Sequence, residues 1–334
     1  MEIFSSATLI IDFHNHFYPA DYVQELNSGN GYARVSTDAE GREIIEYTGD
    51  YNVVVGPHVK LDDRLKAMDR LGIDLEILSL TTPGVERETP ERGVRLARLA
   101  NDGFRSICEK FPSRFRALAV LPLQDPGSSV DELGRAIQDL GLVGVILFSN
   151  VNGKPLDSRE LLPIYEKAAK LGVPLFIHPT SPINSQAMED FRLVPILGFT
   201  VDTSLALLRL VFSGVLERIP NLKIVVAHTG GVFPYLRGRI ETGYNNYPEC
   251  RVHIPSPPSV YFRRNVWVDT VCYDKDLLMS THAFLGPDRI LLGTDFPHQI
   301  SDMEHAVNRI KGLQVSKEEK EKILGGNAAK LLNL

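Results

Sequence analysis

The sequence predicts a distorted (β/α)8 barrel, formed by residues 1–334 as one domain, with a small β-hairpin inserted after the first strand. Eight short apolar runs rich in Val, Ile and Leu alternate with amphipathic stretches. Strands buried on both faces have this continuous apolar pattern, which favours a parallel sheet. The length of 334 residues accommodates a barrel, which typically needs about 250. An open doubly wound sheet is the alternative, but no GxGxxG follows the first run.

The expected strands lie at residues 8–13, 73–80, 115–123, 142–148, 173–177, 222–227, 266–271 and 290–293. Helices are expected between them at 61–71, 94–111, 130–140, 161–171 and 205–219. The first of these, LDDRLKAMDRL, places its apolar residues at 61, 65, 68 and 71, the spacing of one helix face. Glycine follows three of the helices, as helix ends favour. SKEE at 316–319 predicts a capping box at the start of the last helices.

Two segments exceed what a bare barrel needs. Residues 19–60 contain two alternating stretches, YARVST and REIIEYT, around an Asp/Gly turn, which predicts a β-hairpin. The loop after the first strand opens on the catalytic face of a barrel, so this insertion is either a lid over the site or a surface or dimer contact. Residues 243–264 are rich in proline and predict a long irregular loop before the seventh strand.

Composition and charge exclude several classes of function. The formal net charge of −6 argues against a nucleic-acid partner, since such proteins carry a basic face. No run approaches the roughly 18 apolar residues of a transmembrane helix, so no membrane association is expected. The first residues, MEIFSSATLIID, lack the basic segment and cleavage site of a signal peptide. Cys108, Cys250 and Cys272 form no CxxC pair, which predicts reduced thiols and a cytoplasmic protein.

Polar side chains with metal-binding chemistry stand at the carboxyl ends of several strands. His14 and His16 follow IIDF in the first strand, His178 closes VPLFI, and Asp295 follows ILLGT in the last. His14 and His16 are two residues apart, so both point to one face of the strand while Asn15 points away. When the barrel closes, the last strand returns beside the first. Asp295 is then expected next to the histidine pair, with His178 across from them.

This set of imidazoles and one carboxylate predicts a site for one divalent metal ion. Catalytic zinc uses such ligands and keeps a position open for water, and imidazole also suits iron, nickel and copper. The fourth strand ends in LFSN and supplies no lysine to bridge a second ion. His228 closes KIVVA and precedes Thr-Gly-Gly. It is a candidate acid or base beside the metal, with a fourth imidazole ligand as the alternative.

Three further side chains are candidates for substrate binding. Arg192 and Arg239 could each clamp a substrate carboxylate with two parallel hydrogen bonds, with surface ion pairing as the alternative. His298 follows Asp295 by three residues and could line the pocket. The remaining histidines in loops or expected helices are interpreted as solvated, namely His58, His253, His282 and His305.

Five segments together make the chain similar to a known family. They are IDFHNHFYP (11–19), FIHPTSP (176–182), SGVLERIPNLKIVVAHTGGVFPYLRGRIE (213–241), LLGTDFPH (291–298) and ILGGNAAKLLNL (323–334). Over almost its whole length the chain resembles the amidohydrolase superfamily, in the branch around aminocarboxymuconate-semialdehyde decarboxylase. The resemblance implies a distorted barrel with one divalent metal ion, usually zinc, with manganese or iron(II) as alternatives.

The resemblance also implies roles for individual residues. The family's ligand pattern falls on His14, His16, His178 and Asp295. Its catalytic histidine corresponds to His228. The match of Arg239 in LRGRIE implies a homodimer, because such an arginine in the branch's namesake reaches the neighbouring subunit's site. Resorcylate-type relatives often carry Glu where this chain has His14, and the namesake's arginine before the first long helix has no counterpart in YNVVVGPHVK (51–60).

Three hypotheses for the function follow. In the first, the chain is a metal-dependent, non-oxidative decarboxylase of a small hydroxyaromatic or unsaturated carboxylic acid. Asp295 or His228 then protonates the carbon that bears the carboxylate before CO2 leaves. In the second, the same residues hydrolyse a small lactone, ester or amide with activated water. In the third, the barrel is a binding or regulatory subunit without catalysis, and the intact set of His and Asp residues argues against this.

Overall fold

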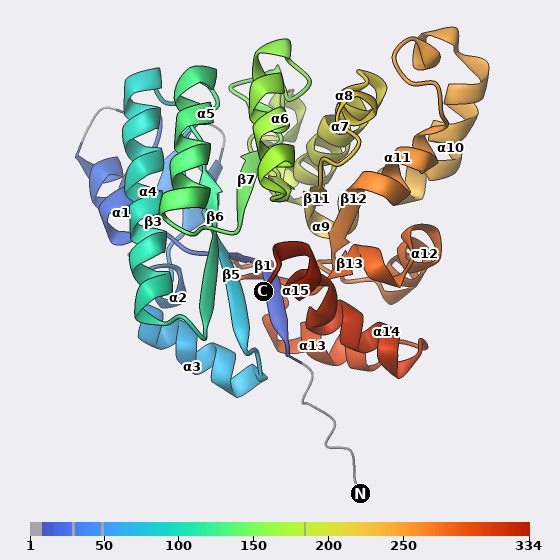
Figure 1. Ribbon diagram of the computed structural model, residues 1–334. Helices are drawn as coiled ribbons and strands as arrows, with labels where there is room; N and C mark the ends of the chain where they lie inside the picture. Colours follow the sequence, from blue (N-terminus) through green and yellow to red (C-terminus); the bar gives the residue numbers. More distant parts are fainter. Residues whose placement is uncertain (1–8, 29–30, 48–49, 184) are drawn as a thin grey trace, which may run out of the picture.

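A computed structural model describes residues 9–28, 31–47, 50–183 and 185–334, and it confirms the predicted barrel of parallel strands flanked by helices (Figure 1). The barrel strands are β1 (Ile11–His16), β5 (Leu75–Ser79), β6 (Phe115–Val120), β7 (Gly144–Phe148), β10 (Leu175–His178), β11 (Ile224–Val226), β12 (Val266–Asp269), β13 (Ile290–Leu291) and β14 (Gly293–Phe296). Their hydrogen-bonded order is β13-β12-β11-β10-β7-β6-β5-β1-β14. Neighbouring strands of the barrel therefore follow one another along the chain, and the last strand, β14, returns to pair with the first, β1.

The barrel closes through a broken last strand, which explains its distortion. β13 pairs with β12, whereas β14 pairs with β1 at His14 opposite Gly293. Leu292 lies between the two pieces, and its N–H donates to the carbonyl of Ile323 instead of to a strand. The return of β14 beside β1 brings Asp295 to the histidine pair, as predicted.

The first strand lies later in the chain than predicted. It runs from Ile11 to His16, whereas the apolar run at 8–13 predicts an earlier position; residue 8 itself lies outside the described residues. Pairing with β5 on one side and β14 on the other continues to the end of the motif, with His16 opposite Ser79. Pairing with both neighbouring strands therefore extends the strand to the polar residues 14–16, although such residues have only a modest preference for strands.

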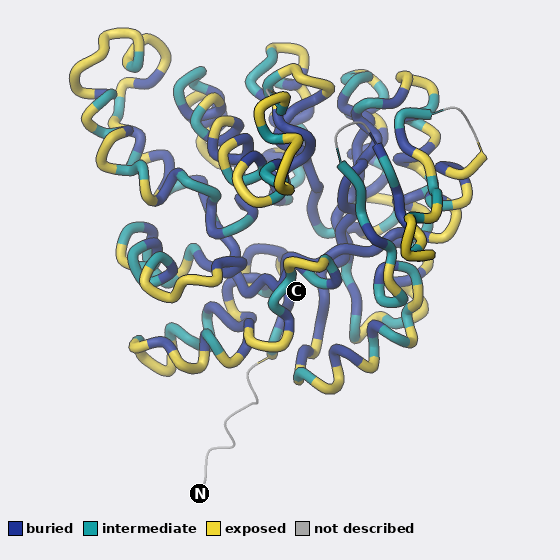
Figure 2. Tube along the Cα trace, turned by 180° about the vertical axis from the view of Figure 1, so that it is seen from behind, coloured by how far each residue is buried: buried dark blue, intermediate teal, exposed yellow. Residues whose placement is uncertain are grey.

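Helices cover the outside of the barrel. They are α3 (Leu61–Leu71), α4 (Pro90–Lys110), α5 (Pro126–Gly134), α6 (Leu162–Leu171), α7 (Phe199–Phe212), α8 (Val215–Arg218), α12 (Lys275–Leu285), α13 (Met303–Lys311), α14 (Lys317–Glu321) and α15 (Asn327–Leu332). The short helix α9 (Ala227–Gly230) instead directly follows the carboxyl end of β11. α3 and α6 end at Gly72 and Gly172, both left-handed, a conformation that glycine adopts without steric cost. The capping box before α14 is present, with Ser316 and Glu319 bonding each other's backbone N–H. Figure 2 shows the buried strands at the centre and exposure concentrated on outer helices and loops.

The insertion 19–60 is larger than the predicted hairpin. It contains α1 (Ala20–Asn27), β2 (Arg34–Thr37), β3 (Glu43–Tyr47), β4 (Asp50–Val53) and α2 (Gly56–Val59). β2 and β3 form the predicted hairpin, in which Asp38 accepts the backbone N–H groups of Glu40 and Arg42 at the turn. β4 adds a third antiparallel strand by pairing with β3. Its sequence, DYNV, is too short and polar to show a strand pattern, so only the pairing reveals it.

The segment 243–264 is only partly the irregular loop that its prolines predict: residues 247–257 contain a short 3-10 turn and irregular backbone, but helices occupy both ends. α10 (Phe233–Asn246) extends into it, and α11 (Pro258–Asn265) occupies its end. Proline is compatible with the first turn of a helix, because that turn's N–H groups have no partner within the helix. Pro257 and Pro258 therefore start a helix here instead of interrupting one.

By length and composition, one helical stretch among the described residues is apolar enough to cross a membrane, namely Asp190–Phe212, with a mean hydropathy of 1.6. This stretch differs from the expectation that no run is apolar enough to span a membrane. Half of its most apolar window is buried inside the protein, and the polar side chains Asp202 and Thr203 are buried within it. This is the pattern of a helix packed against a barrel.

Candidate metal centre and its cavity

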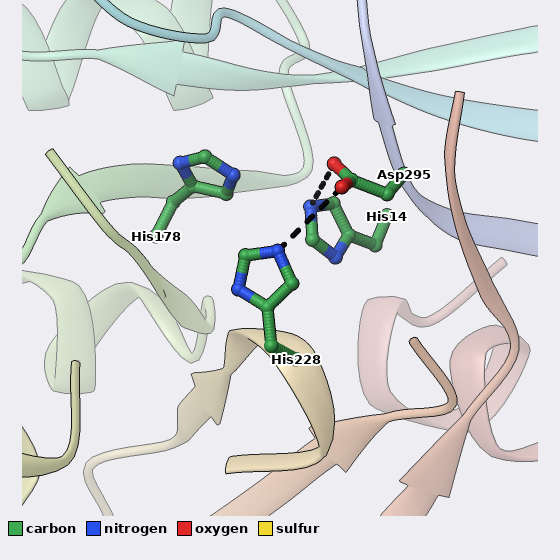
Figure 3. Close-up of side chains that lie close together, drawn as sticks. All are labelled: His14, His178, His228 and Asp295. Carbon is green, nitrogen blue, oxygen red and sulfur yellow. Dashed lines mark ion pairs between the residues drawn. The ribbon is translucent and has the colours of Figure 1, made fainter. Parts of the chain in front are cut away.

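The predicted metal-binding side chains meet at the carboxyl ends of the barrel strands. His14 and His16 lie on β1, His178 ends β10 and Asp295 lies on β14, while His228 follows β11 in the short helix α9. Figure 3 shows His14, His178 and His228 gathered around the Asp295 carboxylate. The barrel's closure therefore brings together residues up to 281 positions apart in the chain, from His14 to Asp295.

Short distances join the reactive atoms of this cluster. The Nε2 atoms of His14 and His16 are 3.1 Å apart, which confirms that the two side chains point the same way. Asp295 Oδ1 lies 3.3 Å from His14 Nε2 and 3.1 Å from His16 Nε2. Asp295 Oδ2 lies 3.6 Å from His228 Nε2.

The outer nitrogens of three histidines are held by hydrogen-bond acceptors. His14 Nδ1 bonds Asp269 Oδ2 at 2.6 Å, and His178 Nδ1 bonds the Pro179 carbonyl at 2.9 Å. His16 Nδ1 lies 3.2 Å from Ser79 Oγ, which donates its own proton to a backbone carbonyl and so accepts from the imidazole. These outer bonds direct each Nε2 at the cluster, as in metal-ligating histidines, and an ion bound there would replace any proton that Nε2 carries.

Several imidazole nitrogens and one carboxylate converge on a common point. Ligand atoms of His14, His178, His228 and Asp295 lie within 4.8 Å of one another, and a second group of His16, Asp295 and His298 shares the same carboxylate. The donor set of imidazole nitrogens and one carboxylate oxygen fits a divalent ion. The cluster is therefore a divalent metal site.

Burial and neighbouring charges set the ionisation of the cluster. Burial lowers the pKa of His16 to about 3 and holds that of His178 well below its usual value. Both rings are thus neutral near pH 7, the form that binds metal. Burial also opposes charge on His14 and Asp295. The Asp269 and Asp295 carboxylates nevertheless raise the pKa of His14 to about 10, and hydrogen bonds from His14, His16 and His228 lower the pKa of Asp295 well below its ordinary range.

Asp269, which the sequence analysis did not single out, organises the cluster from behind. Besides bonding His14, it accepts the backbone N–H groups of His228 (2.9 Å), Thr229 (2.8 Å) and Val271 (3.0 Å). His228 and Thr229 both have φ of +55°, a conformation that costs an L-residue roughly 1–2 kcal/mol. The Asp269 carboxylate therefore holds a strained turn that aims His228 at the site. The sequence signal that could have identified Asp269 is a single carboxylate within the otherwise apolar run VWVDTV at 266–271.

Arg64 is a second support that the sequence analysis missed. It is fully buried, pairs with Glu76, and donates from Nη1 to the His16 carbonyl (2.7 Å) and from Nη2 to Asn15 Oδ1 (2.6 Å). Asn15 thus points away from the metal cluster, as predicted. In the helix 61–71, Arg64 falls on the same face as the apolar residues, and a charge in that position signals a buried partner.

A cavity of about 730 Å³ opens above the cluster. His178, His228, Asp295 and His298 line it near the barrel. Apolar side chains form much of its wall, including Val53, Pro195, Ile196, Phe199, Val271 and Leu277. β4 of the insertion contributes Asp50–Val53 to the same wall, so the insertion is part of the pocket.

The predicted substrate-binding residues have different environments. Arg192 lines the cavity and pairs with Asp50. His298 also lines it, with Nε2 3.0 Å from Thr81 Oγ1. Arg239 is exposed on α10, at the periphery of the molecule (Figure 1), and is not among the described residues that line this cavity.

The expectation that His58 is solvated is wrong. Its side chain is buried, with its ring centre 5.3 Å from that of His298. Its Nδ1 accepts the backbone N–H of Val55 and caps α2. Tyr18 and His298 both pack against the His58 ring, and local sequence does not reveal these contacts.

The chain is similar to several known proteins. A profile of the amidohydrolase family matches residues 11–334. The chain is 34% identical to 2-amino-3-carboxymuconate-6-semialdehyde decarboxylase from Dictyostelium discoideum, over 98% of this chain and 92% of that protein. It is 33% identical to gamma-resorcylate decarboxylase from Polaromonas sp., over 82% of this chain and 87% of that protein. A solved structure of dihydroxybenzoic acid decarboxylase from Polaromonas sp., with bound manganese, has a TM-score of 0.80 at 27% identity, covering 98% of each chain.

Proposed function

Because the chain belongs to the amidohydrolase family, we propose that it is a metal-dependent, non-oxidative decarboxylase of a small hydroxyaromatic or unsaturated carboxylic acid. One observation carries the proposal: the predicted ligands and His228 converge at a cavity with largely apolar walls. Decarboxylation requires a place for the carboxylate, stabilisation of developing negative charge, and a proton donor. The cluster and its cavity supply groups for each.

We propose that His14, His16, His178 and Asp295 hold one divalent ion. The outer hydrogen bonds on the three histidines support this set, whereas His228 Nδ1 is buried without such a bond among the described residues. When bound, the ion supplies a Lewis acid that binds the substrate carboxylate and stabilises negative charge. Zinc suits three imidazoles and a carboxylate, while the Polaromonas dihydroxybenzoic acid decarboxylase holds manganese. Elemental analysis of protein purified without added metal distinguishes the two.

His228 is the proposed proton carrier. Its side chain borders the cavity and is partly exposed to it, and its Nε2 faces Asp295. A proton passes from His228 to the carbon that bears the carboxylate. The carbon–carbon bond then breaks, its electron pair returns to the unsaturated system, and CO2 leaves. Asp295 lies 3.6 Å from His228 Nε2, which allows it to orient the imidazole and share the proton.

The direct test is CO2 release from a pooled panel of hydroxybenzoates and unsaturated carboxylic acids. Metal-loaded wild type should release CO2, and His228→Asn should lose about 100-fold or more of that rate while retaining its metal. Asp295→Asn, in contrast, should lose both metal and activity. Hydrolysis of lactones, esters or amides by a metal-loaded protein that releases no CO2 would contradict the proposal. Full activity of His228→Asn would remove that residue from its role.

We also propose that the protein is a cytoplasmic homodimer, with residues 1–334 as one domain. Exposed apolar side chains support an association surface near the cavity: Phe191, Ile196, Leu197, Val201 and Leu205. Clusters of exposed apolar residues are typical of interaction sites. The cysteines are free thiols, as expected in a reducing compartment. Light scattering should give twice the chain mass, and Ile196→Asp with Leu197→Asp should give monomers; a monomeric wild type would contradict the dimer.

A further inference from the structure

Apart from Asp295 of the metal cluster, the cavity lining carries more negative than positive side chains. Among the described residues that line it, Asp50 and Asp274 are carboxylates, and Arg192 is the lone lysine or arginine. Asp274 caps α12 by accepting the N–H groups of Asp276 and Leu277. The rest of this region is largely apolar, with Pro195, Ile196, Phe199 and Leu277.

Arg192 is already engaged by neighbours in the pocket wall. Its Nη1 lies 2.6 Å from Asp50 Oδ1, and the Asp50 side chain is only 4% exposed. The guanidinium carbon lies 4.5 Å from the centre of the Tyr51 ring. The Asp50 carboxylate also accepts the Tyr51 backbone N–H at 2.8 Å. The charge of Arg192 is thus balanced by Asp50, and one of its faces is covered by Tyr51.

We propose that Asp50 and Arg192 form a selectivity pair that restricts this enzyme to acids whose sole negative charge is the carboxylate that is removed. The proposal rests on the decarboxylase function and names the substrate class within it. The distal part of the substrate is then a neutral ring or chain that carries hydroxyl, amide or apolar groups. Dicarboxylic acids are excluded.

A second carboxylate in this cavity meets no lining lysine or arginine whose charge is uncompensated, because Asp50 already neutralises Arg192. Arg192 uses only Nη1 toward Asp50, and its side chain is 45% exposed, so its other N–H groups can reach a ligand. A second carboxylate bound there would share one positive charge with Asp50, which leaves one negative charge without compensation. A second carboxylate that does not contact Arg192 would still share the cavity with Asp50 and Asp274, and like charges across a binding surface disfavour the complex. A neutral substituent meets neither penalty.

The test compares two substrates that differ in one charge. One is a hydroxybenzoate with a distal carboxamide, and the other has a carboxylate at the same position. For wild type, kcat/KM should favour the amide by about tenfold or more. Asp50→Asn frees Arg192 and should lower this amide-to-carboxylate ratio by about tenfold or more, whereas Arg192→Gln should raise it. Asp276→Asn, an exposed carboxylate outside the cavity on α12, serves as the matched control and should leave the ratio unchanged.

A merely structural role for the pair would change both substrates by the same factor, and that outcome would overturn the proposal. So would a wild type that uses the dicarboxylate as well as the amide. If Asp50→Asn does not fold, the amide-to-carboxylate ratios of wild type and of Arg192→Gln test the proposal without it. If no acid releases CO2, the decarboxylase function fails. Calorimetric binding of the same two compounds to metal-loaded protein then decides the selectivity separately, and equal affinities would overturn it.

Discussion

Replacing Asp269 by asparagine removes one charge from the cluster while keeping the shape of the side chain. The two Asp269 oxygens receive four N–H groups: His14 Nδ1 and His228 N at Oδ2, and Thr229 N and Val271 N at Oδ1. Asparagine offers one oxygen and one NH2 group. In either orientation its NH2 group faces two donors, so two buried hydrogen bonds are lost.

The size of the effect follows from those two losses. A buried donor without an acceptor costs about 1–3 kcal/mol, so Asp269→Asn should lower the free energy of unfolding by about 2–6 kcal/mol. Because Asp269 also fixes His14, metal affinity should fall by about 10–100-fold, the usual effect of changing a group that orients a metal ligand. The strained turn at His228 should relax, which lowers activity further.

Two measurements check this prediction. Urea unfolding of the metal-free protein gives the stability change, and titration against a competing chelator gives the metal affinity. Asp276→Asn, an exposed position on α12, is the matched control and should change neither by more than experimental error. Metal affinity of Asp269→Asn within twofold of wild type would refute the view that Asp269 orients His14.

Three further substitutions test other parts of the structure. Arg64→Met should lower the free energy of unfolding in urea by about 3–5 kcal/mol, because Glu76 loses its buried partner. The control Arg70→Met, on the exposed face of the same helix, should lower it by less than about 1 kcal/mol. Equal losses of stability in the two variants would contradict a buried role for Arg64. Gly231→Ala should destabilise the protein by about 2 kcal/mol or more, because φ is +67° and the new Cβ would lie 2.3 Å from the Thr200 carbonyl oxygen. Gly238→Ala has open space around its Cβ and should stabilise the protein by about 0.5–1 kcal/mol. The same thermal unfolding for both variants would contradict a steric and conformational requirement for glycine at position 231. Burial raises the pKa of Glu86 from 4.5 to about 8, so the stability from its neutral form is complete below pH 4.5 and is lost as the pH rises through 8. Glu86→Gln should therefore match wild type near pH 5 in urea unfolding and exceed it increasingly toward pH 8, and a difference that does not vary with pH would disprove this.

Much of the fold and the candidate ligand set could be predicted because both depend on local signals. Apolar runs mark the strands of a parallel sheet, since both of their faces are buried. Strand ends of a barrel share one face, so His14, His16, His178 and Asp295 could be placed together before their distances were known. Glycine at 72 and 172 marked helix ends for a stereochemical reason that holds in any fold.

The residues that hold the site in place could not be predicted, because their roles depend on contacts between segments that are far apart in the sequence. Asp269 is recognisable only once β12 lies beside β11, where its carboxylate meets the N–H groups of His228 and Thr229. Arg64 acquires its role only when α3 packs against β1 and β5. β4 has no strand pattern of its own and forms because β3 offers an edge. The partner of Arg192, Asp50, comes from that same strand, 142 residues away.

The central claim is that one divalent ion, held by His14, His16, His178 and Asp295, serves decarboxylation. Titrating metal-free wild type with zinc, while following CO2 release from an acid that the panel identifies, tests it most directly. The rate should rise linearly to one equivalent of zinc per chain and then stay constant, with no rate before zinc is added. Full CO2 release without metal, or a rate that rises until two equivalents are bound, would contradict the account.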